Sequence, residues 1–545
     1  MVAGACLATL AVVAIALAAC GTQAASTVKS GGELRLGTDT GIDSLNPFVA
    51  QNTDSFSAFE YAYPELVQYD AQLRFVPDFA MSWQTSPDGL TWTFRTHGNG
   101  KWSDGQPLTA ADAAWTINTV LKYGSGSTAS LATLLAHVKR ATAPDSTTLV
   151  IHYSRPVANV LSQLQQLPIL PEHVWAKLAV GNGSAIRTFQ NSAPVVSGGP
   201  FAIIKYEKNA ITLFKRNPYY YGSAPQIAGF GVEQFSSDDA MLSALKTHQL
   251  DAIETIPPLA VQTVRNEGFV VTDSPGLQST YLCFNSNPAK TNNRELLNPQ
   301  VRLALAHAID LSQIDQVAFD GYAKPGASVI PPASGAWCDP SLKSETYDLA
   351  LANKLLNQTG CPMGSGGVRV AHGHPMNYKV IFPSYLGGSG NRAFQIIQSD
   401  WRKIGVVVSQ QDMDGAAAFN AVCAPNNKYL SFDLEMSEWQ PYVDPDFQLS
   451  VFLKSQWGNW SDSGYDNPTY DKLYNEQGGV MSPTQRLAIV YRMQNMLFND
   501  RPYVVLNYPD WIEAHSPSWT GFVMGPQGSF NEMSKLTMTE VHPTS

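Results

Sequence analysis

Residues 76–115 decide the fold of this chain and read VPDFAMSWQTSPDGLTWTFRTHGNGKWSDGQPLTAADAAW. In the middle of this stretch, the apolar residues Leu90, Trp92 and Phe94 alternate with polar residues. Because side chains on a strand point to opposite faces in turn, this period of two predicts a half-buried strand. The Asp-Gly pair at residues 88–89 predicts the tight turn that leads into that strand.

A helix is predicted to begin at the end of the same stretch. Thr109 is followed three residues later by Asp112, which is a variant of the capping box. Taken in register, the whole stretch resembles the signature of the extracellular solute-binding proteins of family 5, the dipeptide and oligopeptide receptors of ABC importers. The sequence departs from that pattern mainly at residues 97–99 and at Ser103.

Further segments carry the resemblance along most of the chain. They are ILPEHVW at 169–175, SGGPF at 197–201, RNPYY at 216–220, LSALKTHQLD at 242–251 and VRLALAHAID at 301–310. The resemblance implies an α/β protein with the two-lobed type II periplasmic-binding-protein fold (cluster C) and an extra subdomain in the first lobe. The alternation of predicted strands and helices also predicts a largely parallel sheet.

We expect the chain to be divided into seven consecutive segments. The expected segments are a signal peptide (1–19), a lipidated tether (20–30), the first stretch of lobe I (31–61), a lobe I insertion subdomain (62–190), the second stretch of lobe I (191–280), lobe II (281–504) and a C-terminal return to lobe I (505–545). A strand at residues 503–507 is expected to lead the chain back to lobe I.

Composition indicates a globular protein without a nucleic-acid surface. The chain has 545 residues, of which 44% are hydrophobic and 15% charged, and its formal net charge is −10. That length fits roughly three domains or two large lobes. The acidic balance, together with the absence of any Lys/Arg cluster, argues against nucleic-acid binding. No GxSxG, HExxH or Walker motif is present. Together with the resemblance, which spans nearly the whole chain, this absence leads us to expect a binding protein that is not an enzyme and needs no cofactor.

The N-terminal residues predict export from the cytoplasm. Residues 7–19 form a nearly unbroken apolar run, which is too short to span a bilayer comfortably and is typical of a signal peptide. The following residues, 17–20, read LAAC and resemble the lipobox of bacterial lipoproteins. This resemblance implies a lipid on Cys20 that anchors the protein to the outer face of the cell membrane. A plain secretion signal and an N-terminal membrane anchor are the alternatives.

Outside the leader there are four cysteines, and an even number outside the cytoplasm favours disulfides over metal ligation. Cys338 and Cys361 flank one predicted helix, so we expect a disulfide between them. The pairing of Cys283 and Cys423 is left open. We expect no metal site, because the one HxH pair, at residues 372–374, lies in a Gly/Pro turn and a metal needs three or four converging ligands.

The ligand is expected to contact residues 438–447, EWQPYVDPDF, which follow a predicted buried strand. Aromatic faces supply contact area at low entropic cost, and carboxylates pair with polar groups of the ligand. The resemblance implies a cleft loop here, in which peptide receptors place an Asp three residues before the Asp-Pro step. This chain has Pro441 at that position. The candidate ligand-binding residues are Asn46, Tyr63, Ser197, Glu438, Trp439, Tyr442, Asp444, Asp446, Trp457, Trp460 and Tyr508.

These observations predict an extracytoplasmic, monomeric receptor that closes on a peptide or similar solute and delivers it to ABC permease subunits. Members of the resembled family also bind oligosaccharides and nickel chelates, and both remain open here. The alternative from another class is an extracellular hydrolase that uses Glu438 with Asp444 or Asp446 as paired carboxylates. A sensor that signals instead of importing is a further alternative.

Overall fold

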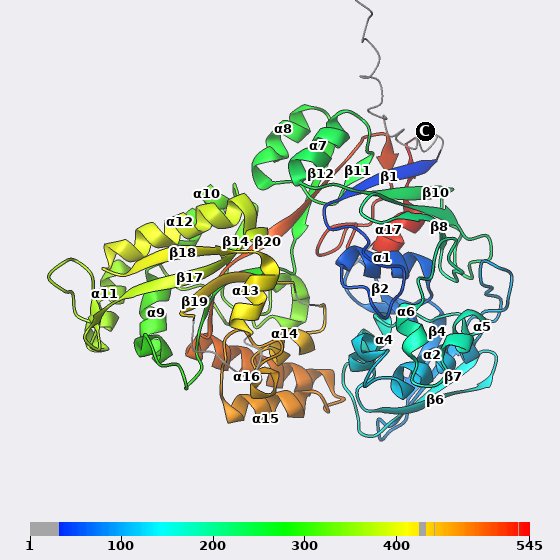
Figure 1. The fold of residues 1–545 in the computed structure, drawn as a ribbon, viewed down its shortest axis with the longest axis horizontal. Helices are drawn as coiled ribbons and strands as arrows, with labels where there is room; N and C mark the ends of the chain where they lie inside the picture. The colour runs from blue at the N-terminus through cyan, green and yellow to red at the C-terminus, as the bar shows by residue number, and fades with distance from the viewer. Residues whose placement is uncertain (1–31, 424–431, 441, 532–533, 545) are drawn as a thin grey trace, which may run out of the picture.

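The computed structural model describes residues 32–423, 432–440, 442–531 and 534–544. Figure 1 shows these residues as two bodies side by side, one with the N-terminal elements in blue and cyan and the other with the yellow and orange elements. A 12-stranded sheet passes through both bodies in the order β18-β17-β19-β13-β20-β11-β1-β10-β9-β8, with β12 and β14 paired to β20. This is the expected two-lobed α/β architecture.

The first lobe contains one end of this large sheet. The helices α1, α7, α8 and α17 accompany its strands. The elements are β1 (Glu33–Thr38), α1 (Thr53–Ala62), β8 (Phe201–Glu207), β9 (Ile211–Arg216), β10 (Gly229–Gln234), α7 (Asp238–Lys246), β11 (Ala252–Ile253), α8 (Val261–Asn266), β12 (Val270–Pro275) and α17 (Ser534–Glu540).

A smaller four-stranded sheet, ordered β4-β5-β7-β6, lies in the same lobe. In β5 (Thr91–Thr96), Trp92 and Phe94 are buried, so the predicted half-buried strand is confirmed. The helix α2 (Ala110–Lys122) begins with the predicted capping box. The Thr109 side chain accepts a hydrogen bond from the backbone of the first turn, and the Asp112 side chain accepts one from the Thr109 backbone amide. The other elements are β2 (Val67–Tyr69), β3 (Phe75–Pro77), β4 (Ala80–Thr85), α3 (Ala129–Ala132), β6 (Val138–Asp145), β7 (Thr148–Tyr153), α4 (Val160–Gln165), α5 (Glu172–Trp175) and α6 (Ser184–Thr188).

The second lobe packs helices on both faces of the other end of the large sheet. Alternate residues of its strands face opposite sides. Leu282 and Met436 face the core under α9 to α12, whereas Tyr281 and Cys283 face the core under α14 to α16. The elements are β13 (Ser279–Phe284), α9 (Pro299–His307), α10 (Leu311–Ala318), β14 (Ala323–Pro325), α11 (Leu349–Gln358), β15 (Val370–Ala371), β16 (His374–Pro375), β17 (Asn377–Pro383), α12 (Gly387–Lys403), β18 (Val407–Met413), α13 (Gly415–Val422), β19 (Leu434–Trp439), α14 (Asp446–Ser450), α15 (Pro468–Gln477) and α16 (Pro483–Asp500).

One strand, β20 (Tyr503–His515), belongs to both halves of the large sheet. Its first residues pair with β13, from Tyr503 to Asn507, and its last residues pair with β11 and β12. A short hairpin of β21 (Trp519–Thr520) and β22 (His542–Pro543) follows. Because β20 crosses from one body to the other in Figure 1, it fixes the second lobe to the first.

The large sheet is mixed, so the expectation of a largely parallel sheet is wrong. The pairs β1-β10, β1-β11, β17-β18 and β17-β19 are parallel. The strands β8 and β9 instead form a hairpin, and β20 runs antiparallel to every strand it meets. Consecutive strands joined by a short turn must pair antiparallel, and a strand that returns from the far lobe enters the sheet in the opposite direction.

Candidate functional site

Five aromatic side chains of the second lobe form a continuous cluster, which we call the aromatic platform. Its members come from α13, the end of β19, the loop before α14, α14 itself and the segment after residue 457. They are Phe419, Trp439, Tyr442, Phe447 and Trp460. Phe447 lies 5.7 Å, centroid to centroid, from each of three other rings, and Phe419 lies 5.5 Å from Trp460. All contacts are edge-to-face, a preferred geometry for aromatic pairs.

The platform leaves large aromatic faces in contact with solvent. Trp460 is 41% exposed, Tyr442 47% and Phe419 39%. Figure 1 places α13 and α14 on the side of the second lobe that faces the first lobe. Contiguous exposed apolar surface of this kind marks an interaction site on a soluble protein. The platform therefore is the strongest candidate for a solute-binding surface in the described residues.

Two contacts fix the platform to the sheet. Trp439 is the last residue of β19 and pairs with Ser279 of β13. Its indole Nε1 donates a hydrogen bond of 3.0 Å to the hydroxyl of Tyr503 on β20. The ring is thereby held at the end of the buried strand, where the chain turns into the platform loop.

The acidic residues of the same loop hold the loop together. The Asp444 carboxylate accepts two hydrogen bonds, of 2.6 and 2.7 Å, from the guanidinium of Arg486 on α16. Asp446 accepts hydrogen bonds from Tyr474 at 3.1 Å and Gln477 at 2.7 Å. Both carboxylates were predicted to bind ligand, and the structure gives both of them intramolecular partners.

Glu438 differs from these two acids, because no Lys or Arg forms an ion pair with it in the described part of the chain. It lies near the end of β19, directly before Trp439, and is half-buried. Burial raises the pKa of its carboxyl to about 7, against a smaller opposing effect of a hydrogen bond with the Gln278 side chain. Glu438 is thus an acid without an ion-pair partner near the end of β19, and its side chain points to the sheet face opposite to that of Trp439.

Trp457 was also predicted to bind ligand, and it lies apart from the five platform rings. Its indole Nε1 donates to the backbone carbonyl of Tyr465 at 3.1 Å, and the ammonium of Lys454 lies 5.1 Å from its ring centroid. The ring packs against the small core cluster around Ile381 and Phe432.

The candidates Asn46, Tyr63 and Ser197 of the first lobe are buried. The Asn46 amide donates to two backbone carbonyls of the segment around α6, each at 2.8 Å. The Tyr63 hydroxyl accepts a 2.8 Å hydrogen bond from Asn191, and the Ser197 hydroxyl donates to the Val195 carbonyl. Each side chain braces a loop, and the structure brings none of the three together with the platform.

Tyr508 of β20, a further candidate, is likewise buried. Its hydroxyl donates to the carbonyl of Ser328 at 2.6 Å and accepts from the amide of Ala327 at 3.0 Å. The ring therefore ties the segment after β14 to the crossing strand.

The cysteine prediction requires a correction. Cys338 and Cys361 are both free thiols in the structure, so the expected disulfide is not formed. Cys361 is buried in the core under α9 to α12, whereas Cys338 packs against the core on the other side of the sheet. The prediction used only the positions of the two cysteines at the ends of one predicted helix, and those positions do not show that the residues pack in cores on opposite faces of the sheet. Cys20, the predicted lipidation site, lies outside the described residues, as does Pro441.

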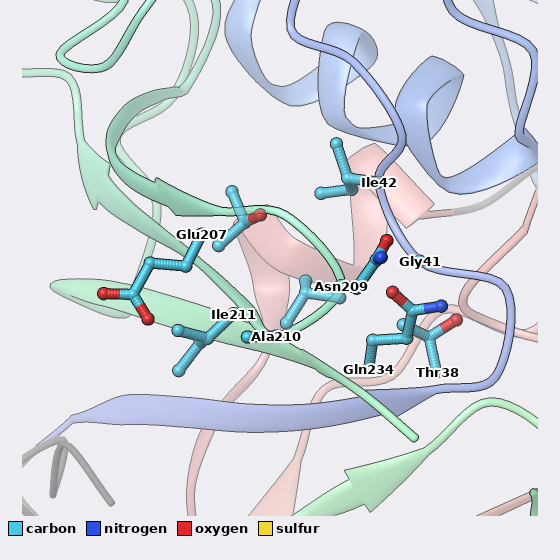
Figure 2. Close-up of a pocket in the computed structure, with 10 residues that line it drawn as sticks. Thr38, Gly41, Ile42, Glu207, Asn209, Ala210, Ile211 and Gln234 are labelled. Carbon is cyan, nitrogen blue, oxygen red and sulfur yellow. The ribbon is translucent and has the colours of Figure 1, made fainter. Parts of the chain in front are cut away.

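The two best-defined hollows of the described residues are too small for a solute. Figure 2 shows one of them in the first lobe, where Thr38 and Gln234 lie side by side and Ile42 and Ala210 contribute apolar walls. Its volume of about 10 Å³ has room for one water molecule.

Sequence reasoning named Trp439, Tyr442 and Trp460 but missed Phe419 and Phe447 as platform members. Phe447 lies inside the segment that was singled out, and its spacing from Tyr442 was the available signal. Phe419 lies in an Ala-rich helix some 40 residues from Trp460, and no local pattern relates the two.

No helix in the described part of the chain combines the length and apolar character needed to cross a membrane.

The sequence model of the bacterial extracellular solute-binding proteins, family 5 Middle, matches residues 74–460. Protein XP55 of Streptomyces lividans is 26% identical over 522 residues, which cover 94% of this chain and 89% of that protein. The probable D,D-dipeptide-binding periplasmic protein DdpA of Escherichia coli K12 is 24% identical over 513 residues, covering 90% of this chain and 92% of DdpA.

Solved structures share the fold. The structure of NikZ from Campylobacter jejuni in complex with Ni(L-His) has a TM-score of 0.79 at 20% identity, and covers 94% of this chain and 99% of NikZ. The periplasmic binding protein DppA from Helicobacter pylori, in complex with the peptide STSA, has a TM-score of 0.75 at 22% identity, with 94% and 98% of the two chains covered.

Proposed function

Because this chain belongs to family 5 of the bacterial extracellular solute-binding proteins, we propose that it is a receptor that captures a peptide or similar small solute between its lobes and delivers it to an ABC permease. Relatives named as peptide-binding proteins of ABC transporters support the ligand class. The family and these relatives are binding proteins, and the mechanism is hinge closure over an unmodified solute.

The observation that carries this proposal is the aromatic platform. Closing the first lobe over Tyr442 and Trp460 removes their exposed faces from water together with an apolar part of the solute. Flat rings supply this contact with few side-chain torsions to order, so the entropic cost is low. A ligand with apolar side chains or flat faces is therefore preferred over a small, fully polar one.

Glu438 supplies the polar part of recognition. In the family pattern an Asp stands at the position of Pro441, and this chain lacks that carboxylate. Glu438 lies three residues earlier in the sequence, directly before Trp439, and is not neutralised by an ion pair with Lys or Arg in the described residues. A cationic group of the ligand placed against Glu438 favours its ionised form, so binding of such a ligand strengthens as pH rises through about 7.

An oligosaccharide is the second candidate ligand, because exposed Trp and Tyr faces also stack on sugar rings. The discriminating experiment titrates the purified chain with three probes by calorimetry: a tripeptide with a central phenylalanine, maltotriose, and the nickel complex of L-histidine. We expect the tripeptide to bind and the radius of gyration from solution scattering to fall on binding. Binding of maltotriose or the nickel complex alone would overturn the peptide assignment.

Substitution tests the platform directly. Trp460→Ala is expected to weaken tripeptide binding by tenfold or more, which corresponds to about 1.4 kcal/mol, because a central aromatic contact is lost. Tyr219→Ala is the matched control, since Tyr219 is a similarly exposed aromatic residue of the first lobe at 43% exposure. Equal affinities of the two variants would contradict a role for the platform.

The hydrolase alternative is disfavoured by the same geometry. Asp444 is neutralised by Arg486, and Asp446 is engaged by Tyr474 and Gln477. Paired carboxylates for glycoside hydrolysis must both face the scissile bond. Glu438→Gln is expected to change affinity and to leave the recovered solute unaltered, whereas loss of a turnover activity would favour a hydrolase.

The proposal includes a lipid on Cys20, residues 1–19 as signal peptide, residues 20–30 as tether, and the lobe boundaries at 31–61, 62–190, 191–280, 281–504 and 505–545. The match to an extracellular family supports export. Fractionation of cells that express Cys20→Ala tests the anchor. The variant is expected in the soluble extracytoplasmic fraction, and retention in the membrane fraction would contradict lipid anchoring at this residue.

A further inference from the structure

A thiol and two carboxylates meet in the interior of the second lobe, away from the solute surface. Cys283 on β13 and Glu435 on β19 are direct partners across the antiparallel pair. Asp462 reaches them from the segment before α15. One ligand atom of each side chain lies within 4.8 Å of the others, and we call these three residues the buried triad.

The triad is shielded from solvent. Cys283 is 0% exposed, Asp462 2% and Glu435 3%. It lies on the sheet face covered by α14 to α16, since its strand neighbour Tyr281 belongs to that core. Two adjacent carboxylates in such surroundings are costly when both are ionised and no cation is present.

The hydrogen bonds of the triad are unevenly distributed. The Asp462 carboxylate accepts from the hydroxyl of Tyr281 at 3.0 Å and from the hydroxyl of Tyr503. Among the described residues, no hydrogen bond or ion pair is formed by the Glu435 carboxylate, although one of its oxygens lies within 4.8 Å of the thiol and of Asp462. A buried polar side chain of this kind is expected to have a partner.

No Lys or Arg of the described chain forms an ion pair with the triad, although the buried Arg302 acts electrostatically on the Cys283 thiol and lowers its pKa slightly. Burial raises the pKa of the Glu435 carboxyl well above its ordinary range, and proximity to Asp462 raises it further. Burial also raises the pKa of Asp462 to about 6 and that of the Cys283 thiol, so at neutral pH Cys283 and Glu435 retain protons whereas Asp462 is largely ionised. These protons are what a bound cation would displace.

We propose that Cys283, Glu435 and Asp462 bind a divalent transition-metal cation, and that zinc is the ion this donor set suits. Zinc accepts thiolate sulfur and carboxylate oxygen in one tetrahedral site, whereas magnesium and calcium require oxygen donors throughout. Binding forms one Zn–S and two Zn–O bonds and, at neutral pH, releases the protons that Cys283 and Glu435 hold, with no change in oxidation state.

The surroundings supply what else such a site needs. Cys423, at the end of α13, is buried and close enough to act electrostatically on Cys283, Glu435 and Asp462. It lies outside the group whose ligand atoms are within 4.8 Å of one another, so it is a neighbour of the site and not one of its ligands. Tyr281 and Tyr503, stacked with ring centroids 4.0 Å apart, orient Asp462 through its hydrogen bonds, as partners behind the ligands do in metal sites.

The site would tie together three segments of the second lobe that are far apart in sequence: β13, β19 and the segment around residue 462. The aromatic platform begins at the end of β19 and includes the neighbouring Trp460. Zinc would therefore stiffen the support of the solute surface without contacting the solute. This role is structural and does not depend on which solute the receptor takes.

The experiment uses the full chain, freed of metal by a chelator and dialysed, and titrated with ZnCl₂ alone. We expect one zinc per chain by elemental mass spectrometry, a raised Tm, and a heat of binding that changes with the ionisation enthalpy of the buffer because protons are released. Zinc affinity is expected to fall as pH is lowered from 8 to 6. Failure of the wild-type chain to bind zinc would overturn the proposal.

Two variants and a matched control locate the ion. Cys283→Ser and Glu435→Gln are each expected to weaken zinc binding at least a hundredfold. Cys361→Ser should bind as the wild type does, since Cys361 is an equally buried free thiol outside the triad. Retention of zinc by both triad variants, or its loss from the control, would contradict the assignment.

A spectroscopic measurement keeps the test independent of variant folding. Cobalt(II) added to the metal-free wild-type chain should give an intense near-ultraviolet thiolate-to-metal band and the visible bands of a tetrahedral ion. Added zinc should abolish both. A spectrum without a thiolate band would exclude Cys283 as a ligand.

Discussion

Asp444 and Arg486 are both buried and are joined by two short hydrogen bonds. Removing one partner leaves the other charge in the interior without compensation. We predict that Asp444→Ala lowers the free energy of unfolding by about 3 to 5 kcal/mol, measured by chemical denaturation. Asp466→Ala is the control, because the Asp466 pair with Lys454 is on the surface and should cost at most about 1 kcal/mol. Similar small losses in both would contradict the structural role of Asp444.

Glu513 on β20 makes stability depend on pH. It is 1% exposed, and burial raises its pKa from 4.5 to about 7 even though it accepts hydrogen bonds from Ser529 and Phe530. Between pH 4.5 and 7 the folded chain therefore keeps a proton that the unfolded chain has released. The unfolded state binds fewer protons in this window, so stability falls as pH rises through it and levels off above 7.

The size of this effect follows from the shift, at about 1.4 kcal/mol per pKa unit, and is about 3 kcal/mol. We predict that Glu513→Gln, which resembles the protonated acid, removes this loss of stability between pH 5 and 8 in urea denaturation series. Glu207→Gln is the control, because Glu207 is a surface residue whose ion pair, among the described residues, is with Lys205. A pH profile that is identical in the wild type and Glu513→Gln would exclude the predicted proton uptake.

Residue roles were the least predictable from sequence. Composition and position singled out Asp444 and Asp446 correctly as members of a distinctive loop, but their partners on α15 and α16 lie tens of residues further on. Asn46 and Tyr63 were identified by their place in the family pattern, and that pattern does not separate a loop-bracing side chain from one that faces the ligand. The buried triad was missed because its members are separated by more than 150 residues between Cys283 and Glu435.

At the scale of elements, the start of α2 gives a prediction for the first lobe. Thr109 caps the helix, and the Asp112 carboxylate accepts a hydrogen bond of 2.9 Å from the Thr109 amide. We predict that Thr109→Ala lowers the free energy of unfolding by about 1 kcal/mol, since backbone donors of the first turn lose a partner. Thr133→Ala, which removes only a long, exposed hydrogen bond, is the control for thermal denaturation. A loss no larger than that of the control would show that solvent replaces the cap.

Elements were well predicted where the signal is local. The alternation around Trp92 and the Thr109 to Asp112 spacing depend on neighbouring residues alone, and both were confirmed. Strand direction is not a local property, so the mixed character of the large sheet was missed. The length of β20 was also underestimated, because residues beyond 507 pair with strands of the other lobe.

At the scale of the whole molecule, both halves of the large sheet depend on β20. The strand pairs with β13 on one side of the molecule and with β11 and β12 on the other. We predict that a chain ending at residue 502 shows no cooperative transition in scanning calorimetry, since β11, β12 and β13 each lose a partner. Co-expression of residues 503–545 as a separate segment should restore the transition. A sharp transition of the shortened chain alone would contradict this dependence.

The late position of β20 has a consequence for biogenesis. A ribosome completes every other strand of the large sheet before it reaches residue 503, yet neither half can close its hydrogen-bond ladder until that point has passed. The pairings of the large sheet that involve β20 therefore stay incomplete until nearly the end of synthesis. Because one strand completes both halves of the sheet, the two bodies reach their final pairing in the same step.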